Sequence, residues 1–270
     1  MTKFHLHLVS DSTGETLSAV SKAALVQFES ADPVEHLWTM VRNHVQVDRV
    51  IDGVTANPGL VMLTIVDHNV REPLQEACRQ LQVPCVSVLD PVIAGLANYL
   101  GVDAGEMPGR QHVMDAEYFG RIDAIHYCLS HDDGQGMQNL AQADVVLVGV
   151  SRTSKTPTCI YLANRGIKAA NVPIVPGIPL PDELGDVNDA LVVGLTASPE
   201  RLVQIRRNRL LSLNQSDETD YVDLMAVKDE VAQARRLFAQ KGWPAIDVTR
   251  RSIEETAAAI FNLYTRRAEL

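Results

Sequence analysis

Short apolar runs alternate along the chain with longer segments in which apolar residues recur every three or four positions. The runs predict strands buried on both faces of a parallel sheet, and the periodic segments predict amphipathic helices. In the first part of the chain the predicted strands are 4–9, 34–41, 60–66 and 84–89, and the predicted helices are 15–28, 70–81 and 91–100. Strands that alternate with helices are typical of βαβ units.

The alternation stops at 101–109, where Asp103, Gly105, Pro108 and Gly109 indicate a connector. A helix is predicted at 116–129, and the pattern of strands and helices resumes at Asp144. There the predicted strands are 144–148, 172–175, 190–195 and 245–248, and the predicted helices are 156–165, 199–211, 221–241 and 253–267. A capping box, Ser252-x-x-Glu255, opens the last of these helices. The sequence shows no internal repeat.

The strongest chemical signal is a loop that follows the apolar run 144–148. It reads Gly149-Val150-Ser151-Arg152-Thr153-Ser154-Lys155-Thr156. A strand that leads into such a loop and then a helix binds nucleotide phosphates through backbone N–H groups, with a lysine for the terminal phosphates and a hydroxyl for Mg²⁺. Ser154 stands where this motif has glycine, in a loop that often needs backbone angles costly for other residues. An ordinary strand-to-helix turn rich in serine and threonine is the alternative.

These elements predict an α/β fold in two domains. An N-terminal α/β domain covers 1–105, a bridging segment covers 106–139, and a C-terminal P-loop kinase-like domain covers 140–270. The loop 149–156 predicts nucleotide binding, with Lys155 as a catalytic residue and Thr156 as a ligand of Mg²⁺.

Composition narrows the class of protein. The 270 residues are 46% hydrophobic and 5% aromatic, as expected of a globular protein, and no apolar stretch has the roughly 20 residues that span a membrane. The N-terminus lacks the apolar segment of a secretion signal, so the cytoplasm is expected. A net charge of −10 argues against non-specific nucleic-acid binding. The four cysteines have neither zinc-site nor redox-motif spacing. Oligomeric state cannot be read from the sequence, which leaves a homo-oligomer open.

Two acidic residues are candidates for a catalytic base. Asp247 ends a predicted strand in the domain of the loop, although an aspartate at that place is more often a cap or turn residue. Asp11 begins a turn, 11–16, at the end of the first predicted strand, where ligands gather in α/β sheets. The same turn contains Ser12-x-x-Glu15, which as a capping box would explain it without a function. Asp67 closes a strand in the manner of a Walker B residue, but it precedes the loop.

Three other groups have two interpretations each. Arg206 and Arg209 share a face of a predicted helix and are either a lid over the transferred phosphate or a solvated basic face. His126, Cys128 and 131–133 contain metal-ligand types but match no zinc spacing, and a loop after a helix explains them. His5 and His7 lie on one face of the first strand, as core or edge histidines do.

Four segments together resemble the pyruvate, phosphate dikinase regulatory proteins, nearly from end to end. They are Val9-Ser10-Asp11-Ser12-Thr13-Gly14-Glu15-Thr16, His131-Asp132-Asp133-Gly134, the loop that begins at Gly149, and Ile246-Asp247-Val248-Thr249 with 252–257. Serine before the lysine also resembles a variant of that family. The regulators of phosphoenolpyruvate synthase are similar, but the Asp-Ser-Thr-Gly-Glu-Thr segment fits the dikinase branch better.

The resemblance implies a bifunctional enzyme. Such proteins use ADP to phosphorylate a threonine in the dikinase active site, which inactivates the dikinase. They also use inorganic phosphate to remove that phosphate as pyrophosphate, which restores activity. Pyruvate, phosphate dikinase is then the partner, with phosphoenolpyruvate synthase as the alternative. A small-molecule P-loop kinase and a non-catalytic nucleotide sensor remain open as other classes.

Overall fold

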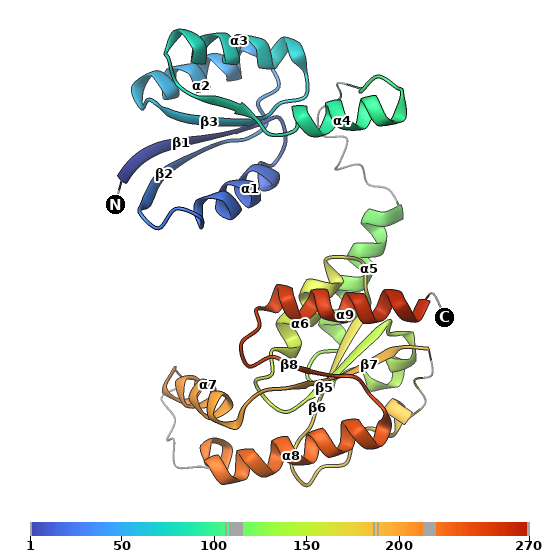
Figure 1. Cartoon of the computed structure of the whole chain (residues 1–270). Helices are drawn as coiled ribbons and strands as arrows, with labels where there is room; N and C mark the ends of the chain where they lie inside the picture. The colour runs from blue at the N-terminus through green and yellow to red at the C-terminus, as the bar shows by residue number, and fades with distance from the viewer. Residues whose placement is uncertain are drawn as a thin grey trace. The chain divides into compact units, whose positions relative to one another are not determined.

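A computed structural model describes residues 2–105, 107, 116–185, 187, 189–212 and 220–268. By its internal contacts the chain divides into two compact units, Met1–Val113 and Met114–Leu270 (Figure 1). Both are α/β, as the sequence predicts. No helix among the described residues is both long and apolar enough to cross a membrane.

The first unit contains a four-stranded parallel sheet in the order β2-β1-β3-β4. Its strands are β1 (Thr2–Ser10), β2 (Ala31–Trp38), β3 (Gly59–Thr64) and β4 (Cys85–Ser87), and its helices are α1 (Glu15–Leu25), α2 (His44–Ala56), α3 (His68–Gln80) and α4 (Asp90–Leu100). The helices α2 and α3 pack together on one face of the sheet, and α1 covers the other face (Figure 1). Two hydrophobic cores, one on each face, result.

The second unit repeats this topology, with a parallel sheet in the order β6-β5-β7-β8. Its strands are β5 (Val145–Gly149), β6 (Ala169–Pro173), β7 (Leu191–Thr196) and β8 (Ala245–Asp247). Its helices are α5 (Ala116–Ser130), α6 (Lys155–Ala163), α7 (Pro199–Ser212), α8 (Leu224–Lys241) and α9 (Ile253–Ala268), with short 3₁₀ helices η2 (Met137–Gln142), η3 (Asp182–Gly185) and η4 (Asp220–Val222).

The buried side chains explain the three layers of the second unit. Alternate residues of β5 point to opposite faces. Val145 and Leu147 pack with α5, α6 and α9, while Val146 and Val148 pack with α7 and α8. All five residues of β5 are buried, as the apolar run predicts for a central parallel strand. In both units the first strand is central and its two neighbours follow later in the chain. Ligands of such sheets bind at the carboxyl ends of these strands.

Several local expectations are confirmed and others are wrong. The capping box of α9 forms, since Ser252 and Glu255 exchange bonds between side chain and backbone of 2.8 and 3.1 Å. The Ser12 capping box does not form, because α1 begins one residue after Gly14, which has a φ of 84° and gives no side-chain cap. The sequence reading omitted α2 altogether and placed β6 a few residues too late. The predicted bridging helix, α5, packs on α6 and β6 within the second unit. The connector is only partly described.

Candidate active site at the carboxyl end of β5

The loop between β5 and α6 crosses the carboxyl end of the central strand of the second unit. Gly149 is required there, because an added Cβ would lie 2.5 Å from the Leu195 carbonyl oxygen on the next strand. Arg152 and Ser154 both have positive φ, 71° and 59°, which is unusual for residues other than glycine. The sequence indicated that Ser154 stands where the loop often needs backbone angles that are costly for residues other than glycine. Its positive φ costs about 1–2 kcal/mol.

Lys155 is the first residue of α6, and only 6% of its surface is exposed. Its Nζ donates to the Val150 carbonyl oxygen at 3.1 Å, so its ammonium group lies within the loop. Burial lowers the pKa of Lys155 to about 8, against the opposing effect of negative groups nearby, Asp133 first among them. A bound phosphate would supply the negative charge that this buried cation lacks.

Thr156 belongs to a cluster of polar side chains beside the loop. Its Oγ1 donates to Asp132 Oδ1 at 2.8 Å, and Asn171 Nδ2 donates to both of these oxygens. The Oδ1 atom of Asn171 is buried and has no partner among the described residues. Mg²⁺ prefers oxygen ligands and is commonly held by one or two carboxylates together with substrate phosphates. The hydroxyl, carboxylate and amide oxygens of this cluster therefore fit Mg²⁺.

A pocket of about 580 Å³ opens over the loop. It is lined by loop residues, by Pro157 at the start of α6, by residues 173–175 at the end of β6 and just beyond it, by Ile205 of α7 and by Asp133. Of the described lining residues, Asp133 is the only acidic one. It has a φ of 53°, and such strained residues cluster at functional sites. Two residues before it in the sequence, His131 is 4% exposed and its Nε2 has no partner among the described residues.

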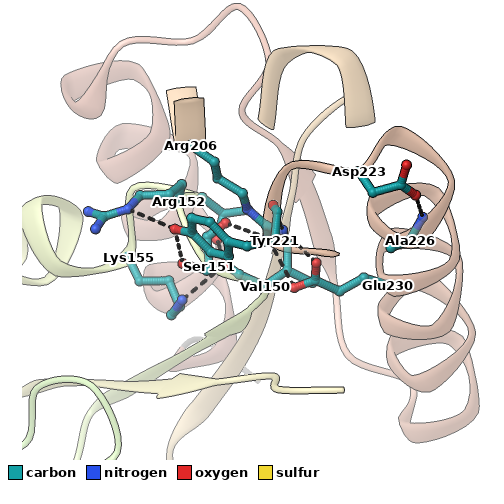
Figure 2. A network of polar contacts seen from close by, with 10 residues as sticks. Val150, Ser151, Arg152, Lys155, Arg206, Tyr221, Asp223, Ala226 and Glu230 are labelled. Atoms are coloured by element: carbon teal, nitrogen blue, oxygen red, sulfur yellow. Dashed lines mark hydrogen bonds and ion pairs between the residues drawn. The ribbon is translucent and has the colours of Figure 1, made fainter. Parts of the chain in front are cut away.

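A second network supports the loop from the side of α7 and α8 (Figure 2). Arg206 is 1% exposed and forms two bonds to Glu230, of 2.8 and 3.0 Å. It also donates to the carbonyl oxygens of Ser151 and Tyr221, at 3.1 and 3.2 Å. The Tyr221 hydroxyl is 3.1 Å from Ser151 Oγ and accepts a bond of 3.4 Å from Arg152 Nε. Arg206 is thus neither a lid nor part of a solvated face, although Arg209 is exposed.

The other predicted residues lie elsewhere. Asp247 is exposed at the end of β8, where its carboxylate accepts bonds from Thr249 N and Arg235. Burial acts to raise the pKa of Asp247, but the bonds from Thr249 and the charge of Arg235 outweigh it and lower that pKa. Asp247 does not line the pocket over the loop. Asp67 caps α3 in the first unit, where it accepts a bond from Asn69 N.

Asp11 also lies in the first unit, at the carboxyl end of β1. Its Oδ2 accepts a bond of 2.9 Å from Val66 N, and Arg42 donates to its carbonyl oxygen at 2.7 Å. Burial raises the pKa of Asp11, against these interactions. Beside it, the buried Ser12 hydroxyl has no partner among the described residues.

Sequence reasoning missed the acidic partners of the loop. Asp132 and Asp133 were explained as a turn after a helix, and Asn171 and Glu230 were not considered. The available signals were the place of the two aspartates after α5, ahead of η2 and the strand of the loop, and the place of Asn171 on the strand after the loop.

Comparisons with known proteins agree on one family. The profile of the kinase/pyrophosphorylase family matches residues 6–261. A protein of Paramagnetospirillum magneticum is 59% identical over 269 residues, which are 100% of this chain and 86% of that protein. A protein of Caulobacter vibrioides is 56% identical, covering 97% of this chain and 83% of its own length, and one of Sphingopyxis alaskensis is 55% identical, covering 99% of both. Their names describe all three as pyruvate, phosphate dikinase regulatory proteins.

Proposed function

The chain belongs to the kinase/pyrophosphorylase family, and we propose that it switches pyruvate, phosphate dikinase off and on. In one direction it transfers the β-phosphate of ADP to a threonine of the dikinase. In the other, inorganic phosphate removes that phosphate as pyrophosphate. The observation that carries the proposal is the phosphate loop 149–156, with a buried lysine and one carboxylate facing the same pocket.

The loop supplies the binding site for two linked phosphates. The N-terminus of α6 lines the pocket, and the backbone N–H groups of a helix N-terminus favour negative charge. Lys155 exchanges its bond to the Val150 carbonyl oxygen for a phosphate oxygen and so neutralises charge that develops during transfer. ADP and pyrophosphate both present two linked phosphates, so one loop serves both directions.

Thr156, Asp132 and Asn171 would hold Mg²⁺ at the edge of this site. The metal ion would neutralise charge on the phosphate oxygens that the loop binds. Within the chain itself, the hydrogen bond from Thr156 to Asp132 fixes the orientation of both oxygens before any ligand binds.

Asp133 is the group we assign to the threonine proton. During phosphorylation its carboxylate accepts the proton from the threonine hydroxyl as the new oxygen–phosphorus bond forms, and the bond to the leaving AMP breaks. In the reverse reaction an oxygen of inorganic phosphate attacks the phosphothreonine, pyrophosphate leaves, and the proton returns to the threonine oxygen. Asp247, the base suggested by the sequence, and Asp11 remain the competing assignments.

The test follows the β-phosphate of labelled ADP in a mixture of this protein and pyruvate, phosphate dikinase. We expect label on a dikinase threonine, and release of labelled pyrophosphate when inorganic phosphate is then added. Lys155→Ala should lower both rates about a hundredfold or more while leaving the fold intact. Asp133→Asn should lower transfer about 10²–10⁴-fold with little change in ADP affinity.

Other outcomes identify other functions. Label on phosphoenolpyruvate synthase instead of the dikinase would change the partner, label on a small molecule would indicate a metabolite kinase, and binding without transfer would indicate a sensor. Failure of ADP to inhibit phosphorolysis at concentrations that saturate phosphorylation would contradict a shared site, and the turn at 11–16 would become the candidate for a second one.

A further inference from the structure

A second cavity, of about 610 Å³, adjoins the phosphate pocket and has no part in the mechanism above. The two share Ser151, Ile174 and Val175. From this common wall the second cavity extends along η4 and the first turns of α8, between Tyr221 and Gln233. Any group placed in it therefore has direct access to the Ser151 end of the phosphate loop.

The position of the cavity suits the substrate that accepts the phosphate better than the nucleotide that donates it. Transfer requires the attacking and leaving oxygens on opposite sides of the phosphorus atom. Pro157 and Thr156 lie at the α6 end of the pocket, whereas Ser151 lies at the other end of the loop. A nucleotide whose nucleoside lies at the α6 end of the pocket would leave the side of Ser151 open to the attacking oxygen.

The assigned base lies beside the same wall. Gly134, the neighbour of Asp133, is close enough to β6 that an added Cβ would lie 3.3 Å from Pro173 Cδ. Pro173 is followed directly by Ile174 and Val175, the residues that both cavities share. A hydroxyl that enters along this wall thus reaches Asp133 and the loop together.

The residues that line the cavity indicate what kind of group can bind there. Ile174, Val175, Pro176 and the Tyr221 ring give it apolar walls, and the exposed carboxylates of Asp220 and Asp229 also line it. The remaining acidic group, Glu230, is paired with Arg206. Asp220 and Asp229 form no ion pair with any residue that the structure describes, and such carboxylates repel phosphate and attract cations. A nucleotide is therefore a poor fit, and a peptide segment with an apolar and a basic side chain is a good one.

We propose that this cavity binds the segment of the protein substrate that carries the accepting threonine, through an apolar side chain in the cavity and a basic residue at Asp220 and Asp229. Tyr221 connects this site to the phosphate loop, because its ring lines the cavity and its hydroxyl contacts Ser151 and Arg152 (Figure 2). The proposal rests on the function proposed above.

The experiment blocks the cavity without touching the loop. Ala226 lines the cavity near the start of α8, and Ala226→Trp should fill part of it. Ala232 lies on the same helix, is exposed and does not line the cavity, so Ala232→Trp is the matched control. Kinetics of label transfer from ADP to the dikinase, calorimetry of ADP binding and thermal unfolding are measured for both variants and for the unmodified protein.

We expect Ala226→Trp to raise the KM for the dikinase, or lower kcat/KM, about tenfold or more, with ADP affinity unchanged within about twofold. Ala232→Trp should behave as the unmodified protein. Asp229→Lys, on the exposed rim, gives a second test if Ala226→Trp does not fold, and should also weaken use of the dikinase without weakening ADP binding.

Each contrary result overturns a different statement. Loss of ADP binding in Ala226→Trp would assign the cavity to the nucleotide, and unchanged kinetics in folded Ala226→Trp or Asp229→Lys would remove the cavity from the acceptor path. If the unmodified protein transfers no label to the dikinase, the proposed function itself fails, and this assignment fails with it.

Discussion

The buried pair Arg206–Glu230 gives the sharpest prediction about stability. The side chain of Arg206 is 1% exposed and that of Glu230 is 9% exposed. Removal of one partner leaves the other charge buried without compensation, which costs about 3–5 kcal/mol. We therefore expect both Arg206→Met and Glu230→Met to lower the free energy of unfolding of the second unit by about that amount.

The double variant should be more stable than either single variant. Replacing both charges with apolar side chains of similar volume is close to neutral for the pair itself. What remains is the loss of the two bonds from Arg206 to the carbonyl oxygens of Ser151 and Tyr221, about 1 kcal/mol each. The expected cost of the double variant is therefore about 2 kcal/mol. This reversal of the usual order distinguishes a charge effect from a simple loss of contacts.

The assay must report on the second unit alone, since the two units need not unfold together. The chain has two tryptophans, Trp38 in the first unit and Trp243, which packs against the core of the second. In a Trp38→Phe background, urea unfolding followed by tryptophan fluorescence therefore reports on the second unit. The control is Arg235→Met, on the same helix as Glu230, which breaks an exposed pair with Asp247 of β8 and should cost under about 1 kcal/mol. A double variant that is less stable than either one of the single variants would refute the reasoning.

Three further predictions concern Lys155, Ser154 and Asp247. Because burial lowers the pKa of Lys155 to about 8 from 10.5, the unfolded state binds more protons than the folded state between these pH values, and the free energy of unfolding of the ligand-free second unit should rise with pH in that window. ADP binding near pH 8 should take up a proton. Calorimetric heats of ADP binding that do not depend on the buffer would contradict this. Ser154→Gly relieves the positive φ at this position and should stabilise the second unit by up to about 1 kcal/mol in the same urea assay, with ADP binding retained. A loss of stability would show that the serine side chain contributes more than its backbone conformation costs. Asp247→Asn weakens contacts with Arg235 and should lower the free energy of unfolding of the second unit by up to about 1 kcal/mol, with phosphate transfer to the dikinase retained. A strong loss of transfer at unchanged ADP affinity would instead identify Asp247 as the catalytic base.

The parts of the structure that depend on neighbouring residues could be predicted from the sequence. The buried run before Gly149 identifies β5, and the spacing of the loop places Lys155 at the start of α6. Even the unusual backbone at Ser154 follows from its place in the motif. These features are local, so a stretch of about ten residues contains the information.

Features that depend on distant partners could not be predicted in this way. Arg206 reads as a surface residue on a basic helix until Glu230, 24 residues later, is known to face it. The contact between Thr156 and Asp132 joins residues equally far apart. The helix α2 was missed although Val47, Val50 and Val54 bury one side of it and Asn43 caps it, because these valines also suit a strand.

The bond between Lys155 and the Val150 carbonyl oxygen has a consequence for how the protein releases its ligands. In the ligand-free loop the ammonium group already has an acceptor, and Thr153 Oγ1 donates to the same oxygen at 2.9 Å. In the proposed function, phosphate binding is therefore an exchange of one acceptor for another, and the Val150 carbonyl oxygen retains the bond from Thr153 when the lysine moves away. Because the bond from Lys155 to the Val150 carbonyl oxygen forms again when the ligand leaves, the net free energy of ligand binding is smaller than the new bonds alone would give. Such a loop would favour fast turnover of whichever phosphate compound is abundant, as the proposed function in two directions requires.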